Sequence, residues 1–194
     1  MKKKVIKAII LAGGSSKRMK LKLPKQLVKI GNKPLLAYTL DVFERSKAVE
    51  SIILVCHKDI MQRCRNLVKR YNYNKIEQLC AGGASRQQSV FNALRVINGC
   101  DYVIVHDGVR PFVTDQIITE AVKAAKRFKA VSCAVPVTDT IVEAKGNFIA
   151  RTLTRNKLWQ IQTPQVFKLD LLIRAHQAAK RNKIFNSTDD AQMV

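Results

Sequence analysis

The stretch Val5-Ile-Lys-Ala-Ile-Ile-Leu11, followed by Ala12-Gly-Gly-Ser-Ser-Lys-Arg-Met19, decides the fold of this chain. The first run is mostly apolar and β-branched, and it is short enough for a buried strand rather than a helix. The small residues after it leave backbone N–H groups unobstructed by Cβ atoms, which creates a cradle for phosphate oxygens. Arg18 and Lys25 follow closely and lie beside that cradle. The segment therefore predicts a buried strand that leads into a nucleotide-binding loop.

Two common phosphate-binding motifs do not fit this loop. Gly14 is followed four residues later by Arg18, so the GxxxxGK[ST] pattern is absent, and GxGxxG is absent as well. Any nucleotide bound here is held in another geometry. The residues alone leave an alternative open, namely an ordinary strand–loop–helix turn whose glycines only allow tight packing.

Apolar runs alternate with amphipathic segments through most of the chain. Further strands are expected at 51–56, 76–80, 101–106 and 130–135, and helices at 34–45, 59–71, 87–98 and 115–128. This alternation is typical of βαβ units and of a mostly parallel sheet that is buried on both faces. We therefore expect an α/β fold with a doubly wound sheet. Its ligand should lie at the carboxyl ends of the strands, where Gly13, Gly83 and Asp107 fall.

The pattern changes after Pro136. Residues 138–153 are typical of two strands joined around Gly146-Asn147, and such a hairpin can project from the sheet and pair with a second subunit. The sequence contains no linker, repeat or low-complexity tract that would divide the chain. We expect a single domain over 1–194, with a β-arm at about 138–158.

The charge of the chain is strongly positive. Lys and Arg number 35 against 14 Asp and Glu, which gives a formal net charge of +21. The basic residues are spread over the whole chain, aromatic residues are few, and no RNA-reading signature is present. We expect a solvated, lysine-rich surface that attracts phosphorylated substrates, with no specific nucleic-acid partner; non-specific RNA binding at low salt would be compatible with it.

Hydropathy and cysteine usage bear on the compartment. No apolar run approaches the roughly 20 residues that a membrane span needs, so we expect no membrane partner. Five scattered cysteines with no CxxC pair are typical of reduced thiols rather than of disulfides or a zinc site. We expect a cytoplasmic protein.

A second glycine loop follows the expected strand at 76–80. In Ala81-Gly-Gly-Ala-Ser-Arg-Gln-Gln-Ser-Val90, Gly82 and Gly83 allow a base or ribose to approach the backbone. Ser89 offers a small donor and acceptor for a base edge. A helix-entry turn capped by Ser85 is an equally good account of these residues alone.

The segment His106-Asp-Gly-Val-Arg-Pro-Phe112 follows the most apolar expected strand. A carboxylate at such a strand end, beside a nucleotide site, is suited to Mg²⁺, which prefers carboxylate and phosphate oxygens. Arg110 can contact a phosphate through two parallel hydrogen bonds. A structural ion pair between Asp107 and Arg110 is the alternative, and we expect His106 to be structural.

Six blocks of the sequence together resemble one family. They are L-A-G-G-x-x-x-R-M at 11–19, P-K-Q at 24–26, G-G-x-x-R-x-x-S-V at 82–90, D-T at 139–140, R-x-x-L-W…T-P-Q at 155–165 and T-D at 188–189. Their order and spacing resemble the methylerythritol phosphate cytidylyltransferases and their ribitol phosphate relatives, over nearly all of the chain. Each later block also has a plain structural account: a turn cap at 138–140, a packed Trp159 in the core or the arm interface, and a helix N-cap before Ala191.

The resemblance implies a Rossmann-like fold of the nucleotide-diphospho-sugar transferase type and a cytidylyltransferase activity. The phosphate of 2-C-methyl-D-erythritol 4-phosphate would attack the α-phosphorus of CTP, and pyrophosphate would leave. No Ser-His-Asp set and no cysteine nucleophile motif is evident, so direct displacement is expected. Two anions must be brought together and charge on the α-phosphoryl group stabilised, which requires fixed cations.

The resemblance also implies roles for individual residues. Arg18 and Lys25 would stabilise the developing charge, Arg155 would position the attacking phosphate, and Asp107 would hold Mg²⁺. The CTP-binding residues would be Leu11, Ala12, Gly13, Gly14, Ser16, Gly83 and Ser89. Arg110, Thr140 and Thr163 would contact the sugar phosphate, some of them across the interface of a homodimer formed through the β-arm.

Three departures from the family pattern keep alternatives open. Ser16 stands where the family commonly has a second loop glycine, and Ala84 stands where some members carry an acidic residue. The chain ends at Val194, where relatives typically continue with a strand, a helix and a phosphate-facing lysine. The alternatives are a ribitol 5-phosphate cytidylyltransferase and, in another class, an inactive, truncated nucleotide-binding protein.

Overall fold

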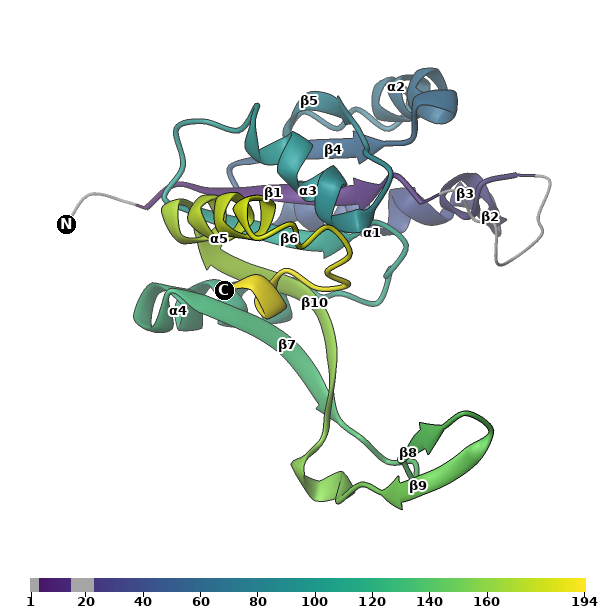
Figure 1. Ribbon diagram of the computed structural model, residues 1–194. Coiled ribbons are helices and arrows are strands. Elements are labelled where there is room, and N and C mark those ends of the chain that lie inside the picture. Colours follow the sequence, from purple (N-terminus) through teal and green to yellow (C-terminus); the bar gives the residue numbers. More distant parts are fainter. Residues whose placement is uncertain (1–3, 15–22) are drawn as a thin grey trace.

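The central sheet of the computed structural model, which describes residues 4–14 and 23–194, has six strands in the order β5-β4-β1-β6-β10-β7 (Figure 1). The strands are β1 (Ile6–Ala12), β4 (Ser51–Cys56), β5 (Ile76–Ala81), β6 (Tyr102–Asp107), β7 (Ala130–Pro136) and β10 (Trp159–Lys168). β1 pairs in parallel with β4 and β6, β4 pairs in parallel with β5, and β10 runs antiparallel to both β6 and β7. The predicted α/β fold with a mostly parallel sheet is confirmed.

Helices cover both faces of this sheet. In the described part of the chain they are α1 (Leu35–Arg45), α2 (Met61–Arg70), α3 (Arg86–Leu94), α4 (Asp115–Phe128) and α5 (Leu169–Arg181). Alternate residues of β1 point to opposite faces: Ile10 packs in one core cluster with α1, α2 and α4, and Ile9 packs in the other with α3 and α5. Burial on both faces explains why the parallel strands are almost continuously apolar.

Strand β10 was not predicted. Its run contains Pro164, and a proline normally argues against a strand in the interior of a sheet. The structure accommodates it at an irregularity, because the register of β10 against β7 shifts between Ile161 and Gln165. Helix α5, which follows directly and packs on the face shared with α3, was not predicted either.

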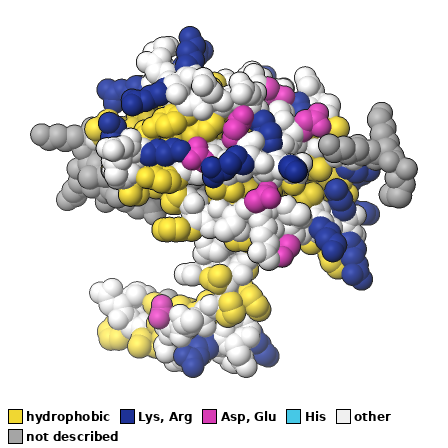
Figure 2. Space-filling model, turned by 180° about the vertical axis from the view of Figure 1, so that it is seen from behind, with side chains coloured by type: hydrophobic (Ala, Val, Ile, Leu, Met, Phe, Trp, Pro, Cys, Tyr) yellow, Lys and Arg dark blue, Asp and Glu magenta, His cyan; other side chains and the backbone are white. Residues whose placement is uncertain are grey.

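Two further hairpins complete the described chain. β2 (Lys29–Ile30) and β3 (Lys33–Pro34) form a small ribbon, and β8 (Val142–Lys145) and β9 (Phe148–Thr152) form a hairpin with a turn at Gly146-Asn147. The β8–β9 hairpin projects away from the sheet (Figure 1), and the space-filling view shows it joined to the body by a narrow neck (Figure 2). Short 3₁₀ turns occur at η2 (Lys25–Leu27), η3 (Lys58–Ile60), η4 (Arg155–Lys157) and η5 (Ala191–Met193).

The surface agrees with the dispersed charge of the sequence. On the face drawn in Figure 2, Lys and Arg side chains are distributed among acidic, polar and hydrophobic ones. None of the helices in the described part of the chain is long and apolar enough to cross a membrane. Cys56, Cys64 and Cys80 are buried, and Cys100 and Cys133 are partly buried; all five are free thiols.

Candidate active site

The first glycine loop leaves the carboxyl end of β1, and a buried glutamine fixes its backbone. Leu11 and Ala12 end the strand, and Gly13 and Gly14 follow. Gln26, which is 1% exposed, donates hydrogen bonds from Nε2 to the carbonyls of Ala12 (2.8 Å) and Gly14 (2.7 Å). The P-K-Q block thus holds the loop in place through its glutamine, a role that the sequence analysis missed. The placement also carries the partly buried Lys25 to the edge of the loop.

The second glycine loop meets the first. The N–H of Gly82 donates to the carbonyl of Cys56 at the end of β4 (2.8 Å). A Cβ at Gly82 would lie 3.2 Å from Ser89 Oγ and 3.5 Å from the Cα of Gly13. A side chain at Gly82 would therefore be tight against Ser89, whereas a Cβ at Gly13 would make ordinary contacts, 3.6 Å from Ser89 Oγ and 3.7 Å from the Cα of Gly82. The small residues thus suit the close approach of the two loops.

Ser85 and Ser89 organise the entry into α3. Ser85 caps the helix by accepting a hydrogen bond from the N–H of Gln88 (3.1 Å), which confirms the predicted cap. Ser89 Oγ donates to the carbonyl of Ser85 (2.8 Å) and accepts from the N–H of Gly83 (3.0 Å). Gly83 itself has no room for a side chain, since a Cβ would lie 2.1 Å from Gln88 Cγ. Ser89 therefore shapes the loop through its hydroxyl, and its role toward a base edge stays a prediction.

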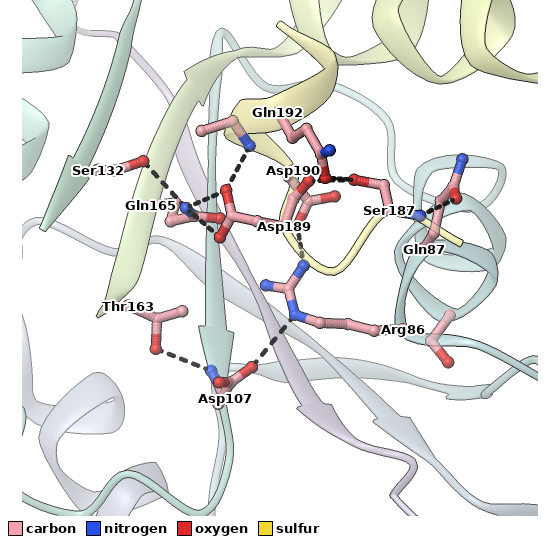
Figure 3. Close-up of polar contacts among 12 residues, drawn as sticks. Arg86, Gln87, Asp107, Ser132, Thr163, Gln165, Ser187, Asp189, Asp190 and Gln192 are labelled. Carbon is pink, nitrogen blue, oxygen red and sulfur yellow. Dashed lines mark hydrogen bonds and ion pairs between the residues drawn. The ribbon is translucent and has the colours of Figure 1, made fainter. Parts of the chain in front are cut away.

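Asp107 ends β6 and lies between Arg110 and Arg86, of which Figure 3 shows Arg86. Its Oδ2 accepts a hydrogen bond from Arg110 Nε (2.9 Å), and its Oδ1 is 3.5 Å from Arg86 Nε. Its N–H donates to Thr163 Oγ1 (3.2 Å), which brings the T-P-Q block of β10 to the end of β6. Arg110 also contacts Gln162 Oε1 through Nη1. The structure thus shows the ion pair between Asp107 and Arg110 that was the alternative prediction for Asp107. The same two residues are the ones predicted to contact a metal ion and a phosphate.

Arg86 connects Asp107 to the last described residues. Its Nη1 donates to Asp190 Oδ2, and Asp190 Oδ1 is 3.1 Å from His176 Nε2 on α5. Burial opposes a charge on Asp190, but the hydrogen bond with His176 and the charge of Arg86 outweigh it and hold the pKa of this carboxyl below its usual value. Asp190 is accordingly a buried anion with two partners.

The neighbouring Asp189 is held by β10. Gln165 Nε2 donates to both oxygens of Asp189 (2.9 and 2.8 Å) and to Ser132 Oγ (2.9 Å), and Asp189 Oδ1 accepts from the N–H of Ala191 (2.8 Å) (Figure 3). The last bond resembles the N-cap expected before Ala191, although the turn that follows is a 3₁₀ helix. Asp189 of the T-D block therefore fastens this segment to β10, and the residue after it, Asp190, is the ion-pair partner of Arg86.

His106 is structural, as the sequence indicated. It is buried on β6, where its ring packs against Phe43 (centroids 5.1 Å apart) and its Nε2 lies 3.2 Å from the carbonyl of Arg110. Burial lowers the pKa of His106 to about 4, so the ring is neutral at pH 7 and Nε2–H donates to that carbonyl. This bond closes the turn that carries Arg110.

The arm residues lie apart from these loops. Arg155 Nη1 donates to the carbonyl of Thr138 (3.0 Å), which ties η4 to the segment that contains Thr140. The described hydrogen bonds and ion pairs of Arg155 stay within the arm and do not reach Asp107. Trp159 is 59% exposed, so it does not pack in the core, and its alternative place at the arm interface stays a prediction.

An apolar hollow adjoins the site. It has a volume of about 850 Å³ and is lined by Arg110, Thr163, the loop around Phe112, the inner side of α4 and strand β7. Phe112 is 93% exposed at its rim. The hollow thus carries two of the predicted sugar-phosphate residues, Arg110 and Thr163, on a mostly apolar wall that also includes Glu120 and Gln162.

Two predicted residues, Arg18 and Ser16, lie outside the described residues. Among the described ones, no group of three or more His, Cys, Asp or Glu side chains could hold a metal ion. Asp107 is thus a single carboxylate beside a phosphate-type loop. This donor set fits Mg²⁺, which is commonly bound through one or two carboxylates together with substrate phosphates and water.

Comparisons of the sequence with known proteins identify one family. A model of the family described as 2-C-methyl-D-erythritol 4-phosphate cytidylyltransferase matches residues 6–194. The chain is 42% identical over 189 residues to the protein of that name from Clostridium kluyveri, covering 96% of this chain and 81% of that one. It is 42% identical over 187 residues to the one from Geobacillus kaustophilus, covering 96% and 82%.

Solved structures give the same result. The crystal structure of 4-diphosphocytidyl-2C-methyl-D-erythritol synthase from Anaerococcus prevotii superposes with a TM-score of 0.85 at 31% identity, over 98% of this chain and 81% of that one. The Thermus thermophilus 2-C-methyl-D-erythritol 4-phosphate cytidylyltransferase gives a TM-score of 0.76 at 28% identity, over 97% and 82%.

Proposed function

The chain belongs to the 2-C-methyl-D-erythritol 4-phosphate cytidylyltransferase family, and from this premise we propose how its residues divide the work of the reaction. The protein is a nucleotidyltransferase of non-mevalonate isoprenoid biosynthesis, which joins CTP and 2-C-methyl-D-erythritol 4-phosphate and releases pyrophosphate. The observation that carries the assignment of the site is the meeting of both glycine loops with Asp107 at the carboxyl ends of β1, β5 and β6.

CTP is proposed to bind between the two glycine loops. The backbone of 11–14 would face the triphosphate, and Gly83 with Ser89 would shape the pocket for the base and ribose. Ser16 stays a contact predicted from the sequence alone. Gln26 supports the role of the first loop because it fixes the loop carbonyls and so orients the intervening N–H groups. A preformed cradle of this kind binds phosphate without reorganisation during the reaction.

Lys25 and Arg18 are proposed to stabilise the charge that develops on the α-phosphoryl group. The attacking group is already a phosphate anion, so the reaction needs positioning and fixed cations more than a general base. Lys25 lies directly beside Gln26, which anchors the loop, and this supports its role.

Mg²⁺ is proposed as the cofactor, with Asp107 as its protein ligand. When bound, Mg²⁺ neutralises and orients the phosphate oxygens of the nucleotide. Binding at Asp107 would compete with Arg110, whose Nε is 2.9 Å from this carboxylate. Arg110 and Thr163 both line the hollow, where Arg110 would hold the phosphate of the second substrate.

A homodimer is proposed to complete the sugar-phosphate site. Arg155 and Thr140 lie on the arm, whereas Arg110 and Thr163 lie on the body. The hairpin exposes Phe148 and other apolar side chains, and the hollow beside Arg110 is apolar; an arm from a second copy would match it in chemistry. The five free cysteines support a reducing, cytoplasmic location.

Replacing Lys25 tests this division of work. We expect Lys25→Ala to lower kcat by roughly 100-fold or more, the usual cost of removing a preorganised charge, with little change in melting temperature. Lys29→Ala, at an exposed position of β2, is the matched control and should leave kcat unchanged. Near-normal turnover in Lys25→Ala would refute the role of this lysine.

A further inference from the structure

The guanidinium of Arg86 lies between two carboxylates at the edge of the site. Its Nε is 3.5 Å from Asp107 Oδ1, and its Nη1 donates a hydrogen bond to Asp190 Oδ2 (Figure 3). Its Nη2 is buried and has no hydrogen-bond partner within the part of the chain that the structure describes. One positive charge thus faces two negative charges. The way it is shared between them determines how much negative charge Asp107 retains.

The geometry gives most of this charge to Asp190. The contact of Arg86 with Asp190 is a direct hydrogen bond, whereas 3.5 Å to Asp107 is too long for a good one. Asp190 is completely buried, and its other oxygen is 3.1 Å from His176 Nε2. A buried carboxylate with two such partners is held firmly, because breaking either contact would leave a charge uncompensated.

The position of Asp190 is fixed from two sides of the fold. The N–H of Ser187 donates to Gln87 Oε1 on α3 (3.1 Å), and Gln165 Nε2 on β10 holds the adjacent Asp189. The segment 187–190 is therefore fastened to the same helix that carries Arg86. Asp190 cannot move away from Arg86 without breaking these bonds.

Asp107 already has one close cation. Arg110 Nε is 2.9 Å from its Oδ2. If Arg86 paired with it as closely, two positive charges would surround a single carboxylate, and the approach of a further cation would be opposed. Some other group must therefore take up the charge of Arg86.

We infer that Asp190 is a positioning residue that holds the charge of Arg86 away from Asp107 and so leaves this carboxylate able to bind a divalent cation. The inference rests on the proposed function, because it takes Asp107 as the metal ligand. It adds a role for Asp190, the residue directly after the T-D block, that neither the proposed substrate contacts nor the hydrogen bonds of Asp189 require.

Mn²⁺ binding in the presence of CTP, without the sugar phosphate, tests the inference. Free Mn²⁺ is followed by its paramagnetic resonance signal, so the measurement does not depend on turnover. In Asp190→Asn, Arg86 has lost its buried anion and shifts toward Asp107; we expect Mn²⁺ affinity to fall about tenfold, the effect of one nearby charge. The Mg²⁺ concentration for half-maximal rate should rise in parallel.

A second substitution should change Mn²⁺ affinity in the opposite direction. Arg86→Met in the Asp190→Asn background removes the competing cation while keeping an apolar stem, so Mn²⁺ affinity should recover toward the wild-type value. Damage to the fold would instead make the double variant bind more weakly than the single one. Wild-type affinity in Asp190→Asn, or no recovery in the double variant, would overturn the inference.

Three further variants separate the possible causes. Asp170→Asn removes an exposed carboxylate of α5 and should bind Mn²⁺ like the wild type. Asp107→Asn should abolish binding; if it does not, the proposed metal role of Asp107 fails, and the inference fails with it. If Asp190→Asn does not fold, Arg86→Met alone decides, since it should bind Mn²⁺ at least as tightly as the wild type, and weaker binding would overturn the inference.

Discussion

At the scale of single residues, Gln26 shows how much of a nucleotide loop depends on a side chain outside it. Its amide supplies two donors to carbonyls of the first glycine loop and lies almost completely buried. When the carbonyls of such a loop accept hydrogen bonds on one side, its N–H groups on the other side can donate to phosphate oxygens. The P-K-Q block is visible in the sequence, but this contact is not. Gln26 is 14 positions from Ala12 and 12 positions from Gly14, and only folding brings them together.

Gln26→Glu keeps the size and shape of the side chain but should weaken its hold on this loop. The carboxylate would face two carbonyl oxygens with no donor, so we expect a loss of about 2 kcal/mol or more in the free energy of unfolding and a raised KM for CTP. Urea denaturation and initial rates measure the two effects. Gln62→Glu, at an exposed position of α2, is the control; equal effects of the two substitutions would contradict the role of Gln26.

His106 makes stability depend on pH. The unfolded chain takes up a proton at this residue near pH 6.5, whereas burial lowers the pKa in the folded chain to about 4. Between these values the unfolded state binds more protons, so acidification favours unfolding, with a loss on the order of 3 kcal/mol across the window. Above pH 6.5 this residue has no effect on the pH dependence.

His106→Gln isolates this contribution, since glutamine can still donate to the carbonyl of Arg110. The variant should lose less stability than the wild type when urea denaturation is compared at pH 7 and pH 4.5. Identical losses in both proteins would show that His106 does not titrate in this way.

At the scale of elements, the parallel strands and the helices between them were predictable, whereas β10 and α5 were not. Strands such as β4 and β6 are buried on both faces and therefore appear as continuous apolar runs. β10 is exposed at its first three residues, contains Pro164 and pairs irregularly with β7. A proline at a register shift cannot be distinguished from a loop proline without the partner strand.

The candidate site also has features that the sequence predicts and features that it does not. Gly13, Gly83 and Asp107 were located correctly because strand ends are visible in the sequence and converge in any doubly wound sheet. The pairing of Arg86 with both Asp107 and Asp190 was not predictable, since Arg86 and Asp190 are 104 residues apart. Only the packing of α3 against α5, which precedes the segment of Asp190, brings them together.

Helix α3 offers a test of how its first turn supports the second glycine loop. Ser89→Ala removes the hydroxyl that links Gly83 to Ser85, so we expect a loss of about 1–2 kcal/mol in stability together with a several-fold higher KM for CTP. Ser85→Ala removes the N-cap and should cost about 1 kcal/mol with a smaller change in KM. An unchanged KM in Ser89→Ala would place this serine outside nucleotide binding.

At the scale of the whole molecule, the body and the arm each carry part of the proposed site. The body holds both glycine loops and Asp107, and the arm holds Arg155 and Thr140. The hairpin projects from the body (Figure 1), so under the proposed homodimer the arm of a second copy would complete the sugar-phosphate site. The lysine-rich composition is expected to favour the approach of both phosphorylated substrates.

Mixing two inactive variants tests the shared site. Asp107→Asn lacks the carboxylate of the body, and Arg155→Ala lacks the cation of the arm. Subunit exchange between them forms heterodimers with one intact composite site, so activity should return to about a quarter of the wild-type value. Each variant alone should stay inactive under the same conditions, and a mixture that gains nothing would show that each site is built from one chain.

The account as a whole depends on the reaction itself. The most direct measurement is pyrophosphate release from CTP and Mg²⁺ with 2-C-methyl-D-erythritol 4-phosphate, with ribitol 5-phosphate as a parallel acceptor. The account predicts release with the methylerythritol compound, little with ribitol 5-phosphate, and strong loss in Lys25→Ala. Release only with ribitol 5-phosphate, or CTP binding without release from either acceptor, would contradict it.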